Sequence, residues 1–412
     1  MFRSPLRILF LVVFMDLVGF GLVLPILPLY ADDLGGSATY IGVLLASYSA
    51  MQFLFNPVWG RLSDRIGRRP VILVSLSGAT ASYLLYGLAE RLAFAPGGAL
   101  VPLLGSRLLA GIMAANIGTA QAYVADVTPP ERRAGGMGTM GAAIGLGFVL
   151  GPALGALFTA EALRSRFGLG LAGFAAAAIC GTNLIWAWLA LPESLPAPHR
   201  AAVRREGLLT RRTLLLAHPP LLLLLGVLFL NALSFSQFEA AFSLLARHRL
   251  GLRPTQIGLI FSYLGVIVVI TQGWLARRWV ARHGERATLV RGVVLMGVGL
   301  GSLPWFGDAW LLGLPLALLG LGYGALQPSQ LALISKHSPA TRQGLALGLG
   351  QAMGSLARIL GPLIALGLFG NVAKAAPFWL AAALAAITVT LVILLPSPAE
   401  GKAVGEEIRA QT

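Results

Sequence analysis

The chain has 412 residues, of which 57% are hydrophobic and 11% charged, and its mean hydropathy is +0.79. Soluble domains carry about 25% charged residues, so this composition excludes a soluble globular protein and indicates an integral membrane protein. The net charge of +15 alone would suit a nucleic-acid partner, and the single cysteine, Cys180, excludes an internal disulfide.

Apolar stretches of about 20 residues recur along the chain, and each is long enough to cross a ~30 Å hydrocarbon core as a helix. The first stretch carries an acid and no small-residue cleavage site, so we interpret it as a retained helix rather than a signal peptide. The sequence predicts an all-α membrane protein with twelve spans near residues 6–30, 40–62, 71–90, 100–126, 136–160, 169–191, 214–246, 254–276, 288–307, 310–335, 343–370 and 374–395.

The basic residues follow the predicted topology. With both termini on one side, that side holds 22 of the 31 Lys and Arg residues and the opposite loops hold 7, while Arg107 and Arg358 fall inside spans. This bias predicts that both termini are cytoplasmic. The positive charge is then a topology signal and a lipid-headgroup contact, and no nucleic-acid partner is expected.

A polar segment rich in Pro and Arg, 192–213, divides the chain. It predicts a six-helix bundle over 1–191, a cytoplasmic linker, a second six-helix bundle over 214–396 and a cytoplasmic tail over 397–412. The two halves repeat: "GFVLGPALGALF" parallels "ARILGPLIALGLF" at an offset of 210 residues. Such a repeat is typical of transporters whose two pseudo-symmetric bundles move about a site near the bilayer midplane.

The first span, "LFLVVFMDLVGFGLVLPILPLY", is apolar at nearly every position except Asp16. A carboxylate at the bilayer centre costs at least about 2.5–3.5 kcal/mol, so Asp16 is a functional candidate. We interpret Asp16 as the leading proton carrier and Arg107 as the partner that tunes it; a fixed structural ion pair is the alternative. Glu239 is a second candidate for proton coupling or for contact with a cationic substrate, against the alternative of a rim carboxylate.

The loop "GRLSDRIGRRP" (60–70) supplies six candidate residues for a conformational latch, with Asp126 as a seventh. Gly60 would allow another helix to approach closely, and Asp64 suits the positive N-terminus of the eleventh span. Arg68 suits an acid such as Asp126. The alternative is a plain topological charge cluster. The seven candidates are Gly60, Asp64, Arg65, Gly67, Arg68, Arg69 and Asp126.

The fifth span carries glycines four residues apart, which share one helix face, and a proline that interrupts the backbone hydrogen bonds. We interpret this as a bending, tightly packed helix between the two bundles that favours export, and ordinary small-residue packing is the alternative. The residues of this antiporter helix motif are Gly138, Gly147, Gly151, Pro152 and Gly155.

These motifs resemble those of the major facilitator superfamily. The 60–70 loop is similar to its Gly-x-Leu-Ala-Asp-Arg-x-Gly-Arg-Arg/Lys loop, and 106–138 resembles the fourth helix and following loop of its drug:proton antiporters. The Gly-x8-Gly-x3-Gly-Pro-x2-Gly pattern resembles that of exporters, and "FMDLVGFGLVLPILP" resembles the first helix of tetracycline:proton antiporters. The chain is identified as a twelve-helix member of the drug:proton antiporter family, similar to tetracycline and multidrug efflux proteins.

The resemblance implies a proton-coupled exporter, associated with drug resistance, that works by alternating access in the bacterial inner membrane, as a monomer and with no cofactor beyond the proton gradient. Ser82 stands where tetracycline exporters have an Asp, and "ATLVRGVVLMGVG" (287–299) lacks their acid in the ninth helix. Small lipophilic or cationic compounds are therefore expected rather than tetracycline–metal complexes. Candidates for the substrate cavity are Gln52, Asn116, Gln121, Tyr123, Gln237, Phe238, Tyr263, Tyr323, Gln327 and Arg358.

Two other functional classes were weighed. An enzyme is not expected, because "GMGTMG" (136–141) follows no strand and no nucleophile or metal motif is present. A transporter of an endogenous sugar, lipid or metabolite, either an exporter or a facilitator, keeps the fold and changes the task. Passive facilitation would survive Asp16→Asn, whereas coupled export would not.

Overall fold

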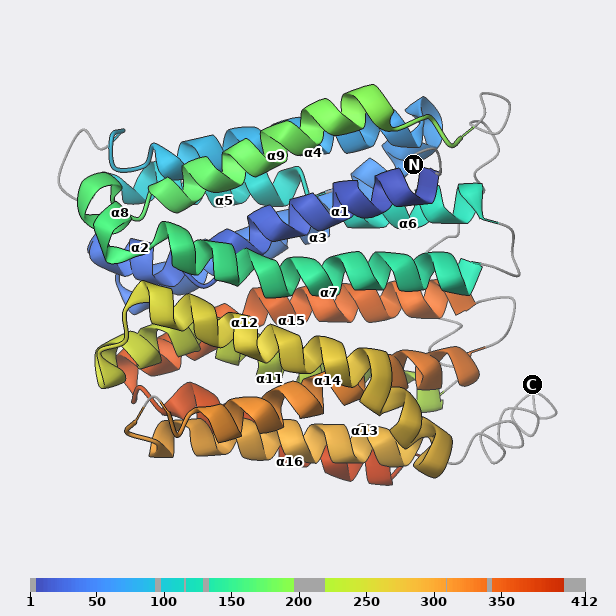
Figure 1. Ribbon diagram of the computed structural model, residues 1–412. Coiled ribbons are helices and arrows are strands. Elements are labelled where there is room, and N and C mark those ends of the chain that lie inside the picture. The colour runs from blue at the N-terminus through green and yellow to red at the C-terminus, as the bar shows by residue number, and fades with distance from the viewer. Residues whose placement is uncertain are drawn as a thin grey trace. The chain divides into compact units, whose positions relative to one another are not determined.

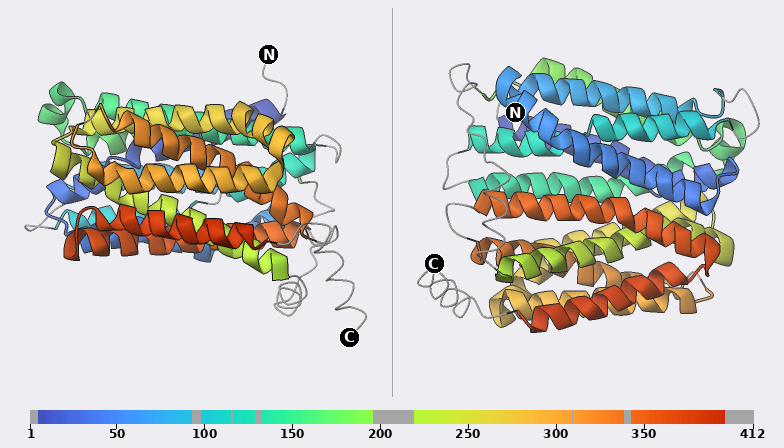
Figure 2. Two further views of the ribbon diagram at one scale, coloured as in Figure 1. Left: turned by 90° about the horizontal axis from the view of Figure 1, so that it is seen from below. Right: turned by 180° about the vertical axis from the view of Figure 1, so that it is seen from behind.

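The computed structural model describes residues 5–92, 98–114, 116–128, 133–195, 219–308, 310–338 and 343–395. Every regular element in these ranges is a helix (Figures 1 and 2). The chain divides into two compact units, the first formed by Met1–Val203 with Ala240–Val266 and the second by Arg204–Glu239 with Ile267–Thr412. Most of the predicted 192–213 linker and all of the 397–412 tail lie outside the described residues, and the bundle boundaries stay a prediction.

Helices α11 (Pro219–Leu250) and α12 (Pro254–Ile270) contribute to both units. The first unit also contains α1 (Pro5–Val23), α2 (Leu27–Asp33), α3 (Ala38–Ile66), α4 (Arg68–Gly87), α5 (Leu100–Ile112), α6 (Asn116–Val127), α7 (Arg133–Phe158), α8 (Glu161–Phe167) and α9 (Leu171–Ala190). The second also contains η3 (Thr271–Leu275), α13 (Ala276–Ser302), η4 (Leu303–Trp305), α14 (Gly313–Lys336), α15 (Gln343–Asn371) and α16 (Ala376–Ile393).

Ten helical stretches in the described ranges are long and apolar enough to cross a membrane. One of them, Pro254–Trp305, has 52 residues and would be about 78 Å long as a straight helix, far more than a ~30 Å core requires. Gly284, at φ 78° and ψ 168°, interrupts it, so it supplies two passes. With α14 as the remaining pass, the twelve-span all-α membrane fold is confirmed.

The first predicted span is not one helix. α1 ends at Val23 and α2 begins at Leu27, because Pro25 has no N–H to continue the hydrogen-bond ladder. Pro28 lies in the first turn of α2, where a missing N–H costs little.

The fourth predicted span, 100–126, is also broken, which corrects the expectation of a continuous helix. α5 ends at Ile112, whose carbonyl accepts a hydrogen bond from Trp59 Nε1 at 2.5 Å. The Met113 carbonyl accepts one from the Ser75 hydroxyl. Side chains of α3 and α4 thus satisfy the backbone at the break, as a chain interrupted inside a bilayer requires.

In the first unit, α1 packs against α7 and α9, and α4 packs against α9 and α5 (Figure 1). The apolar core around α1 includes Leu9, Val12 and Leu17. Within it, Asn183 Nδ2 of α9 donates to the Val12 carbonyl at 2.8 Å. In the second unit, α13 packs against both α14 and α16.

Candidate functional site

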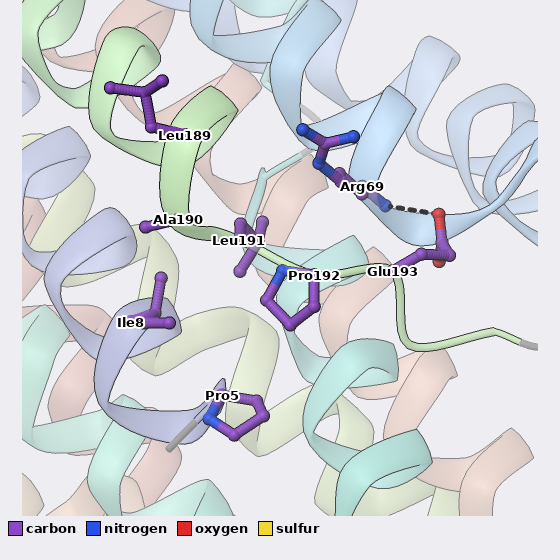
Figure 3. Close-up of a pocket in the computed structure, with 8 residues that line it drawn as sticks. All are labelled: Pro5, Ile8, Arg69, Leu189, Ala190, Leu191, Pro192 and Glu193. Atoms are coloured by element: carbon purple, nitrogen blue, oxygen red, sulfur yellow. Dashed lines mark hydrogen bonds between the residues drawn. The ribbon is translucent and has the colours of Figure 1, made fainter. Parts of the chain in front are cut away.

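The turn between α3 and α4 depends on Gly67, whose φ of 109° favours glycine. Glu193, which follows α9, accepts a hydrogen bond from the backbone N–H of Arg68 at 2.9 Å. It accepts another from the backbone N–H of Arg69 at 3.2 Å (Figure 3). A helix N-terminus has unpaired N–H groups and favours negative charge, so Glu193 caps α4. Glu193 was not predicted as a site residue, because no local sequence pattern connects a residue after the sixth span with residues 60–70.

Arg68 is the centre of the predicted latch. Its Nη1 lies 2.5 Å from Asp64 Oδ1, and its Nε lies 3.1 Å from Asp126 Oδ2. The side chain is buried and also donates to Ser63 Oγ at 2.7 Å. The predicted contact between Arg68 and Asp126 is confirmed, while the role of these residues as a latch stays a prediction.

Ser63, Asp64, Arg68 and Asp126 form a group that we call the loop cluster. The start of the predicted linker is bonded to this loop cluster. The Tyr123 hydroxyl donates to the Pro192 carbonyl at 2.9 Å, and Ser194 Oγ donates to Asp126 Oδ2 at 3.0 Å. Arg69 Nη2 donates to the Trp188 carbonyl at 2.6 Å. The Tyr123 hydroxyl, expected in a substrate cavity, therefore belongs to the loop cluster instead.

A hollow of about 570 Å³ lies beside the loop, lined by Pro5, Ile8, Arg69, Leu189, Ala190, Leu191, Pro192 and Glu193 (Figure 3). It begins at the first residue of α1, about 16 Å along the helix from Asp16. It therefore belongs to the helix ends and contains none of the predicted proton-coupling groups.

An ideal Cβ built on Gly60 meets no described atom within 4 Å, and the close helix approach expected at this glycine stays a prediction. Arg65 is exposed. Arg68, unlike Arg65, has a buried side chain that bonds Ser63 and Asp64.

The second unit has a corresponding cluster with the charges reversed. Gly284 has positive φ, as Gly67 has, and Glu285 follows it as Arg68 follows Gly67. Glu285 Oε1 lies 2.5 Å from Nζ of Lys336, which stands 210 residues after Asp126.

The glycines of α7 pack against α1. An ideal Cβ on Gly147 would lie 2.5 Å from Leu17 Cβ, and one on Gly151 would lie 2.7 Å from Gly21 Cα. A Cβ on Gly155 would lie 2.6 Å from the Leu22 carbonyl oxygen. The close approach thus occurs inside the first unit. Gly138 meets no described atom within 4 Å and stands apart from this contact.

Asp16 and Arg107 share one neighbour in the first unit. Asp16 is half-buried and interacts electrostatically with Tyr83 and Cys180. The Arg107 guanidinium lies 5.7 Å from the Tyr83 ring centroid and 5.5 Å from that of Tyr86. Arg107 is 3% exposed, so aromatic faces stabilise a charge that is almost wholly removed from solvent. Tyr83 and Tyr86 were not predicted as site residues.

Glu239 and several predicted cavity residues come together in the second unit. Glu239 on α11 interacts electrostatically with Arg358 on α15 and with Tyr323 on α14. Tyr323 also interacts with Gln327, one turn along α14, and its ring stacks on Phe235 with centroids 3.7 Å apart and planes at 14°. Phe235 was missed, although it lies one turn before Glu239.

An amide chain extends from this cluster. Gln330 Nε2 lies 3.5 Å from Gln327 Oε1, and Asn231 Nδ2 donates to Gln330 Oε1 at 3.2 Å. Gln237 is fully buried, and neither of its side-chain polar atoms has a partner among the described residues. Phe238 packs 5.8 Å from Phe235.

The four other cavity candidates lie on α3, α6 and α12. Gln121 and Tyr263 are exposed, and Gln52 is half-buried on α3. The side chain of Asn116 lies outside the described residues. The described chain also contains no group of three His, Cys, Asp or Glu residues arranged to hold a metal ion.

The arrangement agrees with comparison to known proteins. The chain matches the model of the Major Facilitator Superfamily over residues 9–281 and 224–411. The chain belongs to the major facilitator superfamily. It is 33% identical over 363 residues to the class C tetracycline resistance protein of Escherichia coli, covering 86% of this chain and 87% of that protein.

A second superfamily relative is the human major facilitator superfamily domain-containing protein 10, 30% identical over 438 residues, with 94% of this chain and 90% of that protein covered. The crystal structure of the human organic anion transporter MFSD10 matches with a TM-score of 0.67 at 28% identity, covering 95% of this chain and 99% of that one. The protein is therefore a multi-pass membrane transporter, and the predicted likeness to tetracycline efflux proteins is confirmed.

Proposed function

We propose that this superfamily member is a proton-coupled exporter of small lipophilic compounds, monomeric in the bacterial inner membrane with both termini cytoplasmic. The observation that carries the proposal is the half-buried carboxylate of Asp16 inside the first span, which interacts electrostatically with Tyr83, the tyrosine whose ring centroid lies 5.7 Å from the buried guanidinium of Arg107. An intramembrane acid of this kind in a transporter is a candidate proton carrier.

The proposed coupling uses the two environments of alternating access. Proton binding neutralises Asp16 and leaves the Arg107 charge to the faces of Tyr83 and Tyr86, whereas proton loss restores an opposite charge near Arg107. Substrate entry displaces the proton on one side, and acid restores it on the other. One proton moved across 100 mV supplies about 2.3 kcal/mol, enough for a roughly fifty-fold gradient of a neutral compound.

The proposed direction of transport and the proposed substrate class are supported by different observations. The export direction follows the glycine motif of α7 and the likeness to tetracycline resistance proteins. The expectation of cationic substrates rests on Glu239, and Arg358 beside it argues for substrates of either charge. The likeness to the human organic anion transporter MFSD10 supports the same widening.

The test uses inside-out vesicles with an acidic interior and a panel of lipophilic cations, anions, neutral drugs and sugars. Compound-dependent proton release in the wild type, lost in Asp16→Asn, is the expected result. Equal release in both proteins would remove Asp16 from the coupling path. A signal for sugars alone would favour transport of an endogenous metabolite.

A further inference from the structure

Glu239 and Arg358 interact electrostatically, but no nitrogen–oxygen distance of 4.0 Å or less joins them in the described part of the chain. Arg358 is exposed, and Glu239 and Tyr323 are half-buried. A small charged group therefore has access to the guanidinium.

Arg358 has unused donors. A guanidinium carries five N–H groups in a planar fork that matches a two-oxygen anion. Among the described residues, its one hydrogen bond runs from Nη2 to Ser355 Oγ, at a long 3.3 Å. A guanidinium left with so many donors is suited to hold a ligand carboxylate.

An aromatic pair begins at Phe235, next to the point where α11 meets α15: a Cβ built on Gly361, three residues after Arg358, would lie 2.5 Å from Ser236 Oγ. Phe235 and Glu239 are four residues apart and share one face of α11. The Phe235 ring stacks on Tyr323, which itself interacts electrostatically with Arg358. Stacked rings offer a planar apolar surface to an aromatic body, and the amides of Gln327 and Gln330 continue along α14.

We propose that Arg358 and the Phe235–Tyr323 pair bind an aromatic carboxylate as transported substrate. This rests on the proposed function only in requiring that the chain carries small lipophilic molecules. A cation at Glu239 would meet the like charge of Arg358, whereas a carboxylate at Arg358 gains two parallel charged hydrogen bonds.

Glu239 makes this site sensitive to pH. The titratable and charged groups facing it among the described residues are Arg358 and Tyr323. Ionised Glu239 competes with a ligand carboxylate for Arg358, and protonated Glu239 does not. Acidification therefore strengthens binding of the carboxylate, by at most about tenfold per pH unit, because one proton is taken up.

The experiment measures binding to the full-length protein in lipid nanodiscs by isothermal titration calorimetry. Three matched probes share one ring system and differ in charge: 1-naphthaleneacetate, its neutral amide and 1-naphthaleneethylamine. The wild type is expected to bind 1-naphthaleneacetate (the acetate probe) most tightly, the amide less tightly and the amine most weakly. Arg358→Gln should weaken acetate binding about 10- to 100-fold and leave amide binding within about threefold.

Three further variants separate the effect of the guanidinium fork from that of charge, test the dependence on pH and provide a control. Arg358→Lys preserves the charge and folding but loses the fork, and should weaken acetate binding about tenfold. Glu239→Gln should strengthen acetate binding at neutral pH and abolish its dependence on pH. Arg291→Gln, the same substitution at an exposed arginine of α13, is the control and should change nothing.

A preference for the amine that Glu239→Gln removes would overturn the proposal in favour of a cation site. Acetate binding unchanged in both Arg358 variants would overturn it as well. Because binding is measured without a proton gradient, these outcomes are separate from the failure of proton-coupled export. A failure to detect proton movement would not contradict the carboxylate site at Arg358. A failure of this site would not contradict proton coupling through Asp16.

Discussion

Gly67 sets the path of the chain into the loop cluster. Its φ of 109° is costly for any residue with a side chain, and a Cβ there would collide with the Glu193 carboxylate that caps α4. Gly67→Ala should therefore lower stability by about 1–2 kcal/mol, measured as an earlier thermal unfolding transition in detergent. Gly60→Ala, inside α3 and with open space around it, should be neutral or stabilising. Equal losses from both variants would contradict this geometry.

Glu90 makes stability depend on pH. It follows α4, outside the spanning segment, and burial, with a smaller contribution from the charge of Asp33, raises the pKa of Glu90 above its ordinary value. The folded chain then holds this proton more tightly than the unfolded chain, so stability falls as pH rises upward from the ordinary Glu value. Glu90→Gln should unfold at a higher temperature than wild type at neutral pH and at the same temperature near pH 4. A constant difference at all pH values would refute this assignment.

At the scale of elements, the contact between α1 and α7 leaves no room for a side chain at Gly151. Gly151→Val would have to separate two helix backbones, at an expected cost of about 2–3 kcal/mol or more. The measurement is the fraction of monodisperse protein left after heating, followed by size-exclusion chromatography. Gly141→Val, on the same helix with no described atom within 4 Å, is the matched control. Comparable losses in both would mean that β-branching in the helix, rather than the contact, decides.

The two loop clusters should differ in strength. The Arg68 side chain is 10% exposed and bonds three partners, whereas the Lys336 side chain is 53% exposed and its described bond is to Glu285. Removing one partner of a buried pair costs about 3–5 kcal/mol, and an exposed pair is worth about 1 kcal/mol or less. Arg68→Ala should therefore destabilise the protein far more than Lys336→Ala, as measured by thermal unfolding. High salt should erase only the second effect.

The helices were predictable from hydropathy, and their interruptions were only partly so. Pro25 marks the break between α1 and α2 in the sequence itself. The break after α5 depends on hydrogen bonds from Trp59 and Ser75, which lie on other helices and leave no signal around residues 113–115.

The same distinction applies to the site residues. An acid or base inside an apolar span is visible in the sequence, and this identified Asp16, Arg107, Glu239 and Arg358. Which of them meet, and through which aromatic neighbour, depends on packing between helices. Tyr83 was therefore not predicted.

At the scale of the whole molecule, each unit of the internal repeat contains a similar ion pair after a glycine, with the charges reversed between the two units. A glycine of positive φ precedes a charged residue that pairs with the end of another helix, as Arg68 with Asp126 and as Glu285 with Lys336. The intramembrane charges also divide between the units, with Asp16 in the first and Glu239 in the second. This division favours separate tasks, proton coupling at the first and substrate recognition at the second.

We propose that Asp16 couples proton movement to transport without being needed for substrate exchange. The most direct test reconstitutes wild type and Asp16→Asn in liposomes, using a compound that the vesicle panel identifies. Counterflow of labelled compound and proton flux, reported by an internal pH dye, are measured in the same preparation. If Asp16 carries the coupled proton, the Asp16→Asn variant keeps counterflow and loses substrate-driven proton flux. Proton flux that persists at the wild-type ratio to substrate would contradict it.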